Sequence, residues 1–495
     1  MRKLCLAGLI LGISFTLLFA VEPENLSLPN SSPLVTFRIL LKAGSANDPS
    51  GKEGVASLTA AMLSRGGSRE KTYAQIVESL FPMAASVSAQ VDKEMTVFEG
   101  TAHRENLDAY YEILRSMLLD PGWREDDFRR LKDETINFLR IQLRSNNEEE
   151  LGKEALYLQI YKGHPYGHHS AGTLASLQAL TLDDVKAFYQ ANYRRGNVVI
   201  GLAGGFPEAF LKKAESEFSM KLPDGTPQPV TLPEPKAPSK LRVQIIQKET
   251  RATAISLGFP IGVTRSHPDW PALKLAESYF GQHRSSKSYL YQRIREVRGM
   301  NYGDYAYIEY FPRGMFLFKP DTNLGRRQQI FQVWIRPVEP QNGLFALKVA
   351  LYELNKLVTK GMSAEDFEST RVFLSKQVNL LAQTQSEQLG YALDSRYYGI
   401  GDYNTFLRDA LAKLTSADVN RAIRQHLSTD RMRIVIVTKD PQPFRDAVAK
   451  NTPSPITYNS PKPKEIIDED ASIQRYRVNA KPEDVTVVPV EKVFE

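Results

Sequence analysis

Histidine is the residue type in this chain with the clearest chemical potential, and three of the seven histidines lie close together. His164, His168 and His169 fall within one short segment, so their imidazoles could share a metal ion in a loop. Structural zinc normally takes four ligands, often including cysteine. The single cysteine, Cys5, lies in an N-terminal apolar segment that we expect to be removed. A structural turn is therefore the simpler interpretation, and a loop metal site stays open as an alternative.

Other catalytic motifs give little support to an independent enzyme. The glycines within residues 201–205 lack the G-x-G-x-x-G spacing of a dinucleotide site. The chain contains neither a Walker A pattern nor a G-x-S-x-G nucleophile elbow. The net charge is +6, but we find no Lys/Arg block dense enough to indicate nucleic-acid binding. We consider three hypotheses for this chain, and an independent enzyme is the weakest of them, because no motif supports a catalytic mechanism.

One amphipathic helix is predicted over residues 50–67. Ser50 and Glu53 have the spacing of a capping box, and two glycines, Gly66 and Gly67, can end the helix. Val55, Leu58 and Met62 form one apolar stripe. By pattern alone this is an ordinary packed helix.

The N-terminus has the pattern of a secretory signal peptide. Arg2 and Lys3 precede the apolar segment Leu4–Ala20, which lies at the short limit for a membrane span. A permanent anchor is the rival interpretation. We expect an exported, periplasmic or secreted protein without a stable membrane span after cleavage, and the mature chain would contain no cysteine.

The chain repeats itself once. Three residue pairs recur in the same order at separations of 234 to 239 residues, which indicates a duplicated domain and not an array of short repeats. These pairs are Asp127-Phe128 with Asp366-Phe367, Leu151-Gly152 with Leu389-Gly390, and Asp184-Val185 with Asp418-Val419.

Strand and helix patterns are mixed within each half without regular alternation, which predicts an α+β fold with mainly antiparallel sheets. We expect strands over 34–43, within 86–100, and over 198–202, 241–246 and 254–259, and helices over 107–119, 126–145, 272–280, 344–359 and 364–383. The expected divisions are a signal peptide (1–20), an N-terminal domain (21–222), a Pro-rich linker (223–240), a C-terminal domain (241–452) and an extended tail (453–495).

Ordered landmarks give the chain a family resemblance. The sequence Gly-Ser-Ala-Asn-Asp-Pro at 44–49, Gly-Val-Ala at 54–56, His-Pro-Tyr-Gly at 164–167 and Gly-Thr at 172–173 resembles the pitrilysin/insulinase (M16) zinc metallopeptidase family. The resemblance covers residues 34 to 450. It implies two homologous domains that together form half of a clamshell, and it explains His164 as part of a structural turn.

Active members of that family carry an H-x-x-E-H zinc motif on the first helix, in which two histidines bind zinc and the glutamate acts on bound water. The matching positions here are Ser57, Ala60 and Ala61. Alanine has no ligand atom, and a serine hydroxyl is a poor ligand for zinc. Glu134 is the one glutamate near the expected third ligand. The resemblance therefore implies a member that lacks a catalytic metal.

A second family element is intact in the C-terminal half. The segment 295–302, Arg-Glu-Val-Arg-Gly-Met-Asn-Tyr, resembles the R-E-x-R-G-L-x-Y element, whose Arg and Tyr hold substrate and stabilise charge on the scissile carbonyl. Both side chains are suitable donors to an oxyanion. The ordinary alternative is that Arg295 makes a salt bridge and Tyr302 packs at a sheet edge.

The leading hypothesis is a non-catalytic subunit that pairs with a zinc-bearing homologue in a two-chain peptidase. In that heterodimer Arg295 and Tyr302 bind the peptide and stabilise the transition state, and zinc belongs to the partner, with no cofactor in this chain. The alternative is a peptide-binding or assembly scaffold with no role in proteolysis.

Overall fold

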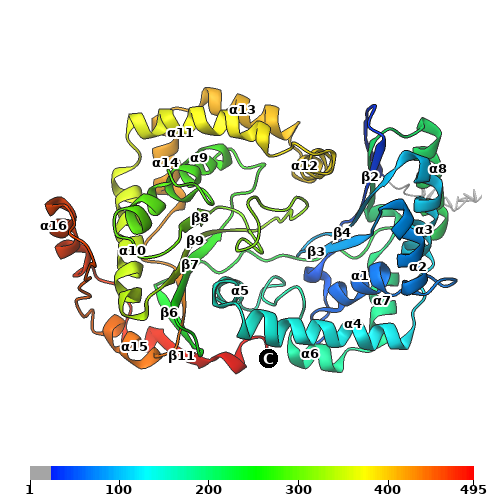
Figure 1. Ribbon diagram of the computed structural model, residues 1–495. Helices are drawn as coiled ribbons and strands as arrows, with labels where there is room; N and C mark the ends of the chain where they lie inside the picture. The colour runs from blue at the N-terminus through cyan, green and yellow to red at the C-terminus, as the bar shows by residue number, and fades with distance from the viewer. Residues whose placement is uncertain (1–23) are drawn as a thin grey trace, which may run out of the picture.

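The computed structural model describes residues 24–495, so the predicted signal peptide, residues 1–20, lies outside the described residues. Figure 1 shows two lobes, with the N-terminal half of the chain coloured from blue through cyan to green and the C-terminal half from green to red. Each lobe is built on one sheet with helices packed on it. The predicted α+β fold with two related halves is confirmed.

The first sheet has five strands in the order β1 (Glu24–Pro29), β5 (Val198–Gly204), β2 (Leu34–Leu41), β4 (Thr96–His103) and β3 (Ser88–Val91). Only the outer pair β1/β5 is parallel. In the centre, Ile39 lies opposite both Phe98 and Ile200. Strand β2 is buried along nearly its whole length, as expected for a strand covered on both faces.

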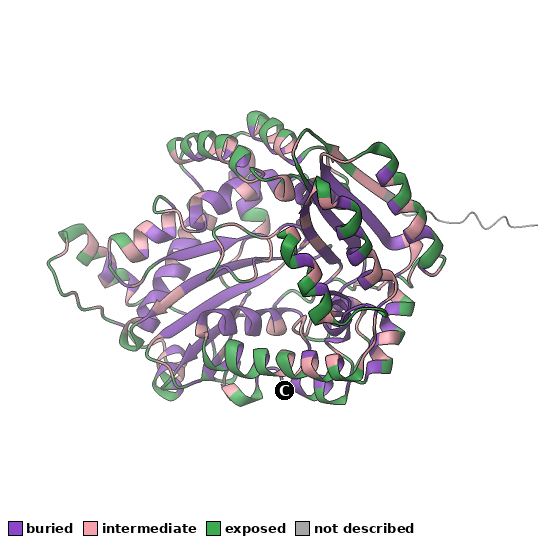
Figure 2. Cartoon of the chain, turned by 45° about the vertical axis from the view of Figure 1, so that its right-hand side comes forward, coloured by how far each residue is buried: buried purple, intermediate pink, exposed green. Residues whose placement is uncertain are grey.

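The second sheet has six strands in the order β11 (Val485–Pro489), β6 (Arg242–Gln247), β10 (Arg433–Thr438), β7 (Thr253–Ile261), β9 (Gln329–Val338) and β8 (Asp304–Tyr307). Strand β6 is parallel to both of its neighbours, and the remaining pairs are antiparallel. Figure 2 shows these strands buried and the outward helix faces exposed.

Helices surround both sheets. The N-terminal half contributes α1 (Val55–Arg65), α2 (Tyr73–Leu80), α3 (Leu107–Leu119), α4 (Glu125–Asn137), α5 (Glu148–Ile160), α6 (Leu174–Ala179), α7 (Leu182–Asn192) and α8 (Glu208–Lys221). The C-terminal half contributes α9 (Trp270–Gly281), α10 (Gly343–Lys360), α11 (Ala364–Gln377), α12 (Gln385–Tyr398), α13 (Tyr403–Lys413), α14 (Ser416–His426), α15 (Pro441–Ala449) and α16 (Lys464–Ile473).

Two helices are exchanged between the halves. Helix α5 of the N-terminal half packs on β7 and β10 of the second sheet, and α12 of the C-terminal half packs on β2 and β5 of the first. These are the helices that carry the repeated pairs Leu151-Gly152 and Leu389-Gly390. The exchange joins the lobes through apolar cores, because Leu389 and Leu393 pack with Leu40 of the other half.

The C-terminal tail is more structured than we predicted. It is not wholly extended, because it contains helix α16 and adds β11 to the edge of the second sheet. Its last residues then reach the other lobe, where Phe494 packs in the N-terminal core and its carbonyl accepts the Leu174 N–H. Between α8 and β6 the chain forms no helix or strand. Within residues 24–495 we find no helix with the length and apolar character that a membrane span requires.

Candidate functional site

Helix α1 carries Ser57, Ala60 and Ala61, the positions that we matched to the zinc motif, and its start differs from our prediction. The helix begins after Gly54, not at Ser50, and Gly54 has a φ of 96°. The Asp48 carboxylate, and not the predicted Ser50/Glu53 box, accepts the N–H groups of Gly54 and Ala56 at 2.7 and 2.9 Å. Gly54 is also required for space, because a Cβ there would lie 2.5 Å from the Ala171 carbonyl oxygen.

The degenerate positions line an open pocket. Ser57, Ala60 and Ala61 share a cavity of about 780 Å³ with Glu134 and His169. The Ser57 hydroxyl donates to the Ser170 carbonyl at 2.6 Å, and Glu134 forms an ion pair with Arg65 at 2.6 Å. Ala60 and Ala61 offer no ligand atom, and the Glu134 carboxylate is paired with the Arg65 guanidinium. These residues do not fit a zinc ion.

The three clustered histidines do not converge on one point. His164 Nε2 lies 3.0 Å from the Pro233 carbonyl, and His168 Nε2 lies 3.2 Å from an Asp48 oxygen. His169 Nδ1 accepts the Ala171 N–H at 3.0 Å, and burial lowers its pKa to about 3. Among the residues that the structure describes, these three histidines do not form a group with metal-like spacing. Each imidazole instead fixes a different turn of the chain.

A cleft runs from this pocket toward the other lobe. A second cavity, of about 410 Å³, shares Phe138, Gln142 and His169 with the first and is closed on the C-terminal side by Tyr310 and Phe316. Strand β3, the edge of the first sheet, lies along both cavities. An exposed strand edge can pair with an extended peptide. Strand β3 therefore presents its unpaired edge to the cleft.

Buried charges fix the two sides of this cleft. The Arg326 guanidinium pairs with Asp92 of the other half, with Nε 2.6 Å from Oδ2, and lies 3.7 Å from the centre of the Tyr310 ring. The Tyr310 hydroxyl donates to Glu154 at 2.8 Å. Burial raises the pKa of the Glu154 carboxyl. This network joins residues of the two halves beside the cleft.

The structure brings Arg295 and Tyr302 together. Arg295 lies in a π-helical turn, Tyr291–Glu296, and donates through Nη1 to the Tyr302 carbonyl at 3.1 Å. Its guanidinium lies 4.8 Å from the Tyr291 ring centre and 5.7 Å from that of Tyr302. Tyr302 is 73% exposed. The pocket that Tyr302 lines shares no residue with the cleft beside α1.

The carboxylates of Glu469 and Asp470, in the C-terminal tail, hold the segment 295–302. The sequence analysis did not predict this contact. Arg298 is fully buried and donates to Asp470 and Glu469, both at 2.9 Å. Tyr458 also donates to Asp470 at 2.6 Å. The one available signal in the sequence was the acidic pair Glu469-Asp470, which lies about 170 residues after Arg298. Charges so far apart along the chain do not specify a contact.

The duplicated two-sheet fold, with Ser57, Ala60 and Ala61 on its first helix, defines the class of protein: a peptidase-like fold made of two related halves. Residues 26–174 match the family model described as insulinase, peptidase family M16, and residues 179–372 match the model described as peptidase M16 inactive domain. The chain belongs to the M16 family.

Curated relatives and solved structures agree with this assignment. The chain is 20% identical over 450 residues to a Helicobacter pylori protein named non-peptidase homolog YmxG, covering 88% of this chain and 97% of that protein. It is 24% identical over 265 residues to an uncharacterized zinc protease, YmxG, of Bacillus subtilis, covering 53% of this chain and 63% of the relative, which is less than two thirds of its length.

Among solved structures, a peptidase M16 inactive domain from Pseudomonas fluorescens superimposes with a TM-score of 0.74 at 22% identity, covering 84% of this chain and 96% of that one. This likeness establishes the fold alone.

Proposed function

We propose that this chain is the non-catalytic subunit of a two-chain M16 peptidase. It pairs with a homologous subunit that bears zinc, and it supplies Arg295 and Tyr302 to bind the peptide and stabilise the transition state. The observation that carries this proposal is a division within the chain: the zinc positions hold Ser57, Ala60 and Ala61, whereas the Arg/Tyr pair is intact.

The geometry of the pair supports a role toward a second molecule. Stacking between two phenol rings holds the Arg295 guanidinium, and the Tyr302 side chain is mostly exposed. Two donors held in place before substrate binds can stabilise negative charge without the cost of reorganisation. Because Tyr302 does not share a pocket with the cleft beside α1, its substrate would be held in another chain.

We further propose that the chain is exported, on the basis of its N-terminal pattern, and that it contains no catalytic metal. The zinc of the assembled enzyme would belong to the partner. The open cleft along β3 would then bind and orient a peptide, with the cleaved bond at the partner's centre.

Reconstitution with a zinc-bearing homologue from the same genome tests the proposal. The variants are Arg295→Ala, Tyr302→Phe and a control, Arg129→Ala, which changes an exposed ion pair with Asp126. We expect the complex to cleave peptides far faster than either chain alone. Each of the first two variants should reduce kcat by about a hundredfold or more, as loss of an oxyanion donor does elsewhere, and the control should not.

Two outcomes would contradict this assignment. If the homologue is fully active alone and does not bind this chain, there is no two-chain enzyme. If the complex forms but the Arg295 and Tyr302 variants behave as the unaltered chain does, the protein is a peptide-binding or assembly scaffold.

A further inference from the structure

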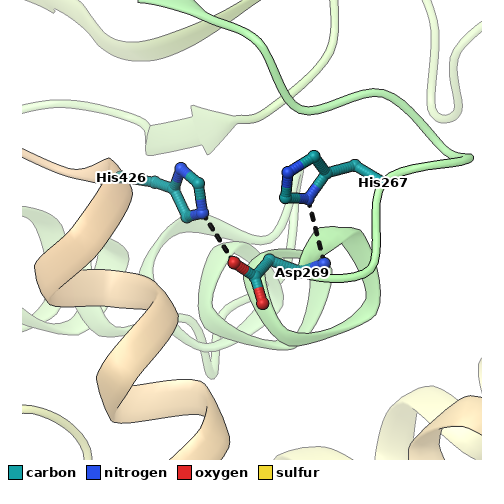
Figure 3. Close-up of side chains that lie close together, drawn as sticks. All are labelled: His267, Asp269 and His426. Carbon is teal, nitrogen blue, oxygen red and sulfur yellow. Dashed lines mark hydrogen bonds and ion pairs between the residues drawn. The ribbon is translucent and has the colours of Figure 1, made fainter.

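We propose that His267, Asp269 and His426 form a zinc-binding site in the C-terminal lobe, separate from the altered zinc motif on α1. These residues are the one group of three or more His, Asp or Glu side chains with metal-like spacing within residues 24–495. One ligand atom from each lies within 4.8 Å of the others. Figure 3 shows the two imidazoles on either side of the Asp269 carboxylate.

The elements that carry these residues pack together. His267 lies in the loop between β7 and α9, Asp269 is the N-cap residue of α9, and His426 is the last residue of α14. Helices α9 and α14 contact each other. A bound ion would therefore connect the start of one helix to the end of another, at a position where chain segments about 160 residues apart meet.

The ligand types select the metal. Two imidazoles and one carboxylate suit Zn²⁺, whereas Mg²⁺ and Ca²⁺ prefer oxygen ligands alone. Three protein ligands leave a fourth position of a tetrahedral site for water. Both histidines are partly exposed and Asp269 is buried, so an ion could enter from solvent.

Hydrogen bonds connect the residues that would bind the ion. His426 Nε2 lies 2.8 Å from Asp269 Oδ2, and Arg421 Nη2 donates to Oδ1 at 2.6 Å. Arg421 also donates through Nη1 to Oδ2 at 3.3 Å. Zinc would replace both contacts at Oδ2 and leave the guanidinium on Oδ1, as a hydrogen bond commonly supports a ligating carboxylate. His267 Nδ1 accepts the Asp269 N–H at 3.0 Å. To bind the metal through Nδ1, His267 would have to give up this hydrogen bond. Arg421 also competes with zinc through its charge.

Calorimetric titration of the tag-free, EDTA-treated chain with Zn²⁺ at pH 7.5 tests the site. We expect a saturable site that is lost in His267→Ala and in His426→Ala, and retained in the control His103→Ala, an exposed histidine of the other lobe. Arg421→Gln should bind zinc more tightly, because it removes the competing charge.

Co²⁺ in place of zinc should give the strong visible absorption of a tetrahedral ion in the unaltered chain but not in the two histidine variants. Circular dichroism of each variant before titration identifies any that does not fold, and His267→Ala is the mildest because it loses one backbone hydrogen bond. Absence of saturable binding, or unchanged binding in both His267→Ala and His426→Ala, would overturn the site. Neither result bears on the role of Arg295 and Tyr302.

Discussion

Asp48 shows how one side chain can decide where a helix begins. Its carboxylate accepts two N–H groups at the start of α1 and also contacts His168. A carboxylate at this position satisfies donors that have no partner within the helix, and its charge is favourable at the positive end of the helix dipole. Ser50 and Glu53 had the right spacing for a capping box, but Glu53 Oε1 accepts the Gly51 N–H instead.

Buried neutral histidines should make the protein sensitive to mild acid. Burial lowers the pKa of His169 to about 3 and that of His283 to about 4, against about 6.5 in the unfolded chain. Below pH 6.5 the unfolded chain binds protons that the folded chain does not, so their stabilising effect is complete above pH 6.5 and is lost as the pH falls. Each contributes a slope of up to about 1.4 kcal/mol per pH unit.

Urea unfolding at pH 7, 6 and 5 measures this slope. His169→Gln should reduce the loss of unfolding free energy on going from pH 6 to pH 5, whatever its effect at pH 7. His103→Gln, on a partly exposed histidine of β4, is the control substitution. An identical slope in all three chains would mean that His169 titrates normally in the folded state.

At the scale of elements, both parts of the candidate site include π-helical turns. The turn Phe138–Ser145 continues α4 and lines the cleft with Phe138 and Gln142, and the turn Tyr291–Glu296 carries Arg295. Such turns are rare and are often found at functional sites, because the wider turn changes the direction of the side chains that follow. Their presence supports a functional interpretation of both segments.

The tail helix α16 should hold the Arg/Tyr element in place. Asp470→Ala removes a partner from the buried Arg298 guanidinium, which should cost on the order of 3 kcal/mol of unfolding free energy. Residues 297–303 should then exchange amide hydrogens faster, because Arg298 lies between Arg295 and Tyr302. The matched control is Asp468→Ala, two residues earlier on the same helix, whose carboxylate is 61% exposed and should contribute less than about 1 kcal/mol. Equal protection of 297–303 in both variants would show that the tail does not support this segment.

For the whole molecule, the exchange of α5 and α12 makes each half depend on the other for its core. Helix α12 approaches the loop before β9 so closely that a Cβ on Gly390 would lie 2.0 Å from Thr322 Oγ1. The matching Gly152 of α5 has more room, since its nearest neighbour, Ser256 Oγ, would be 3.5 Å away. The two repeats therefore contain the same Leu-Gly dipeptide, but lack of space requires glycine only at position 390.

Gly390→Ala should reduce the unfolding free energy by about 1–2 kcal/mol, because overpacking outweighs the better helix propensity of alanine. Gly401→Ala is the matched control, since a Cβ there meets no atom within 4 Å. Urea unfolding followed by tryptophan fluorescence compares the two variants. A Gly390→Ala chain as stable as the unaltered one would show that the Thr322 loop moves aside at little cost.

The sequence by itself determined the repeat, most elements and the residue types at Ser57, Ala60 and Ala61, because apolar periodicity and residue type are local properties. Helix α3 and strand β2 lie where the pattern placed them, and alanine cannot bind zinc in any fold. Only the tertiary structure decided which helix covers which sheet, that Asp48 caps α1, that the tail holds Arg298, and that His267 and Asp269 meet His426. Each of these is a contact between distant segments, and the free energy that selects it comes from burial and charge pairing, which no local pattern encodes.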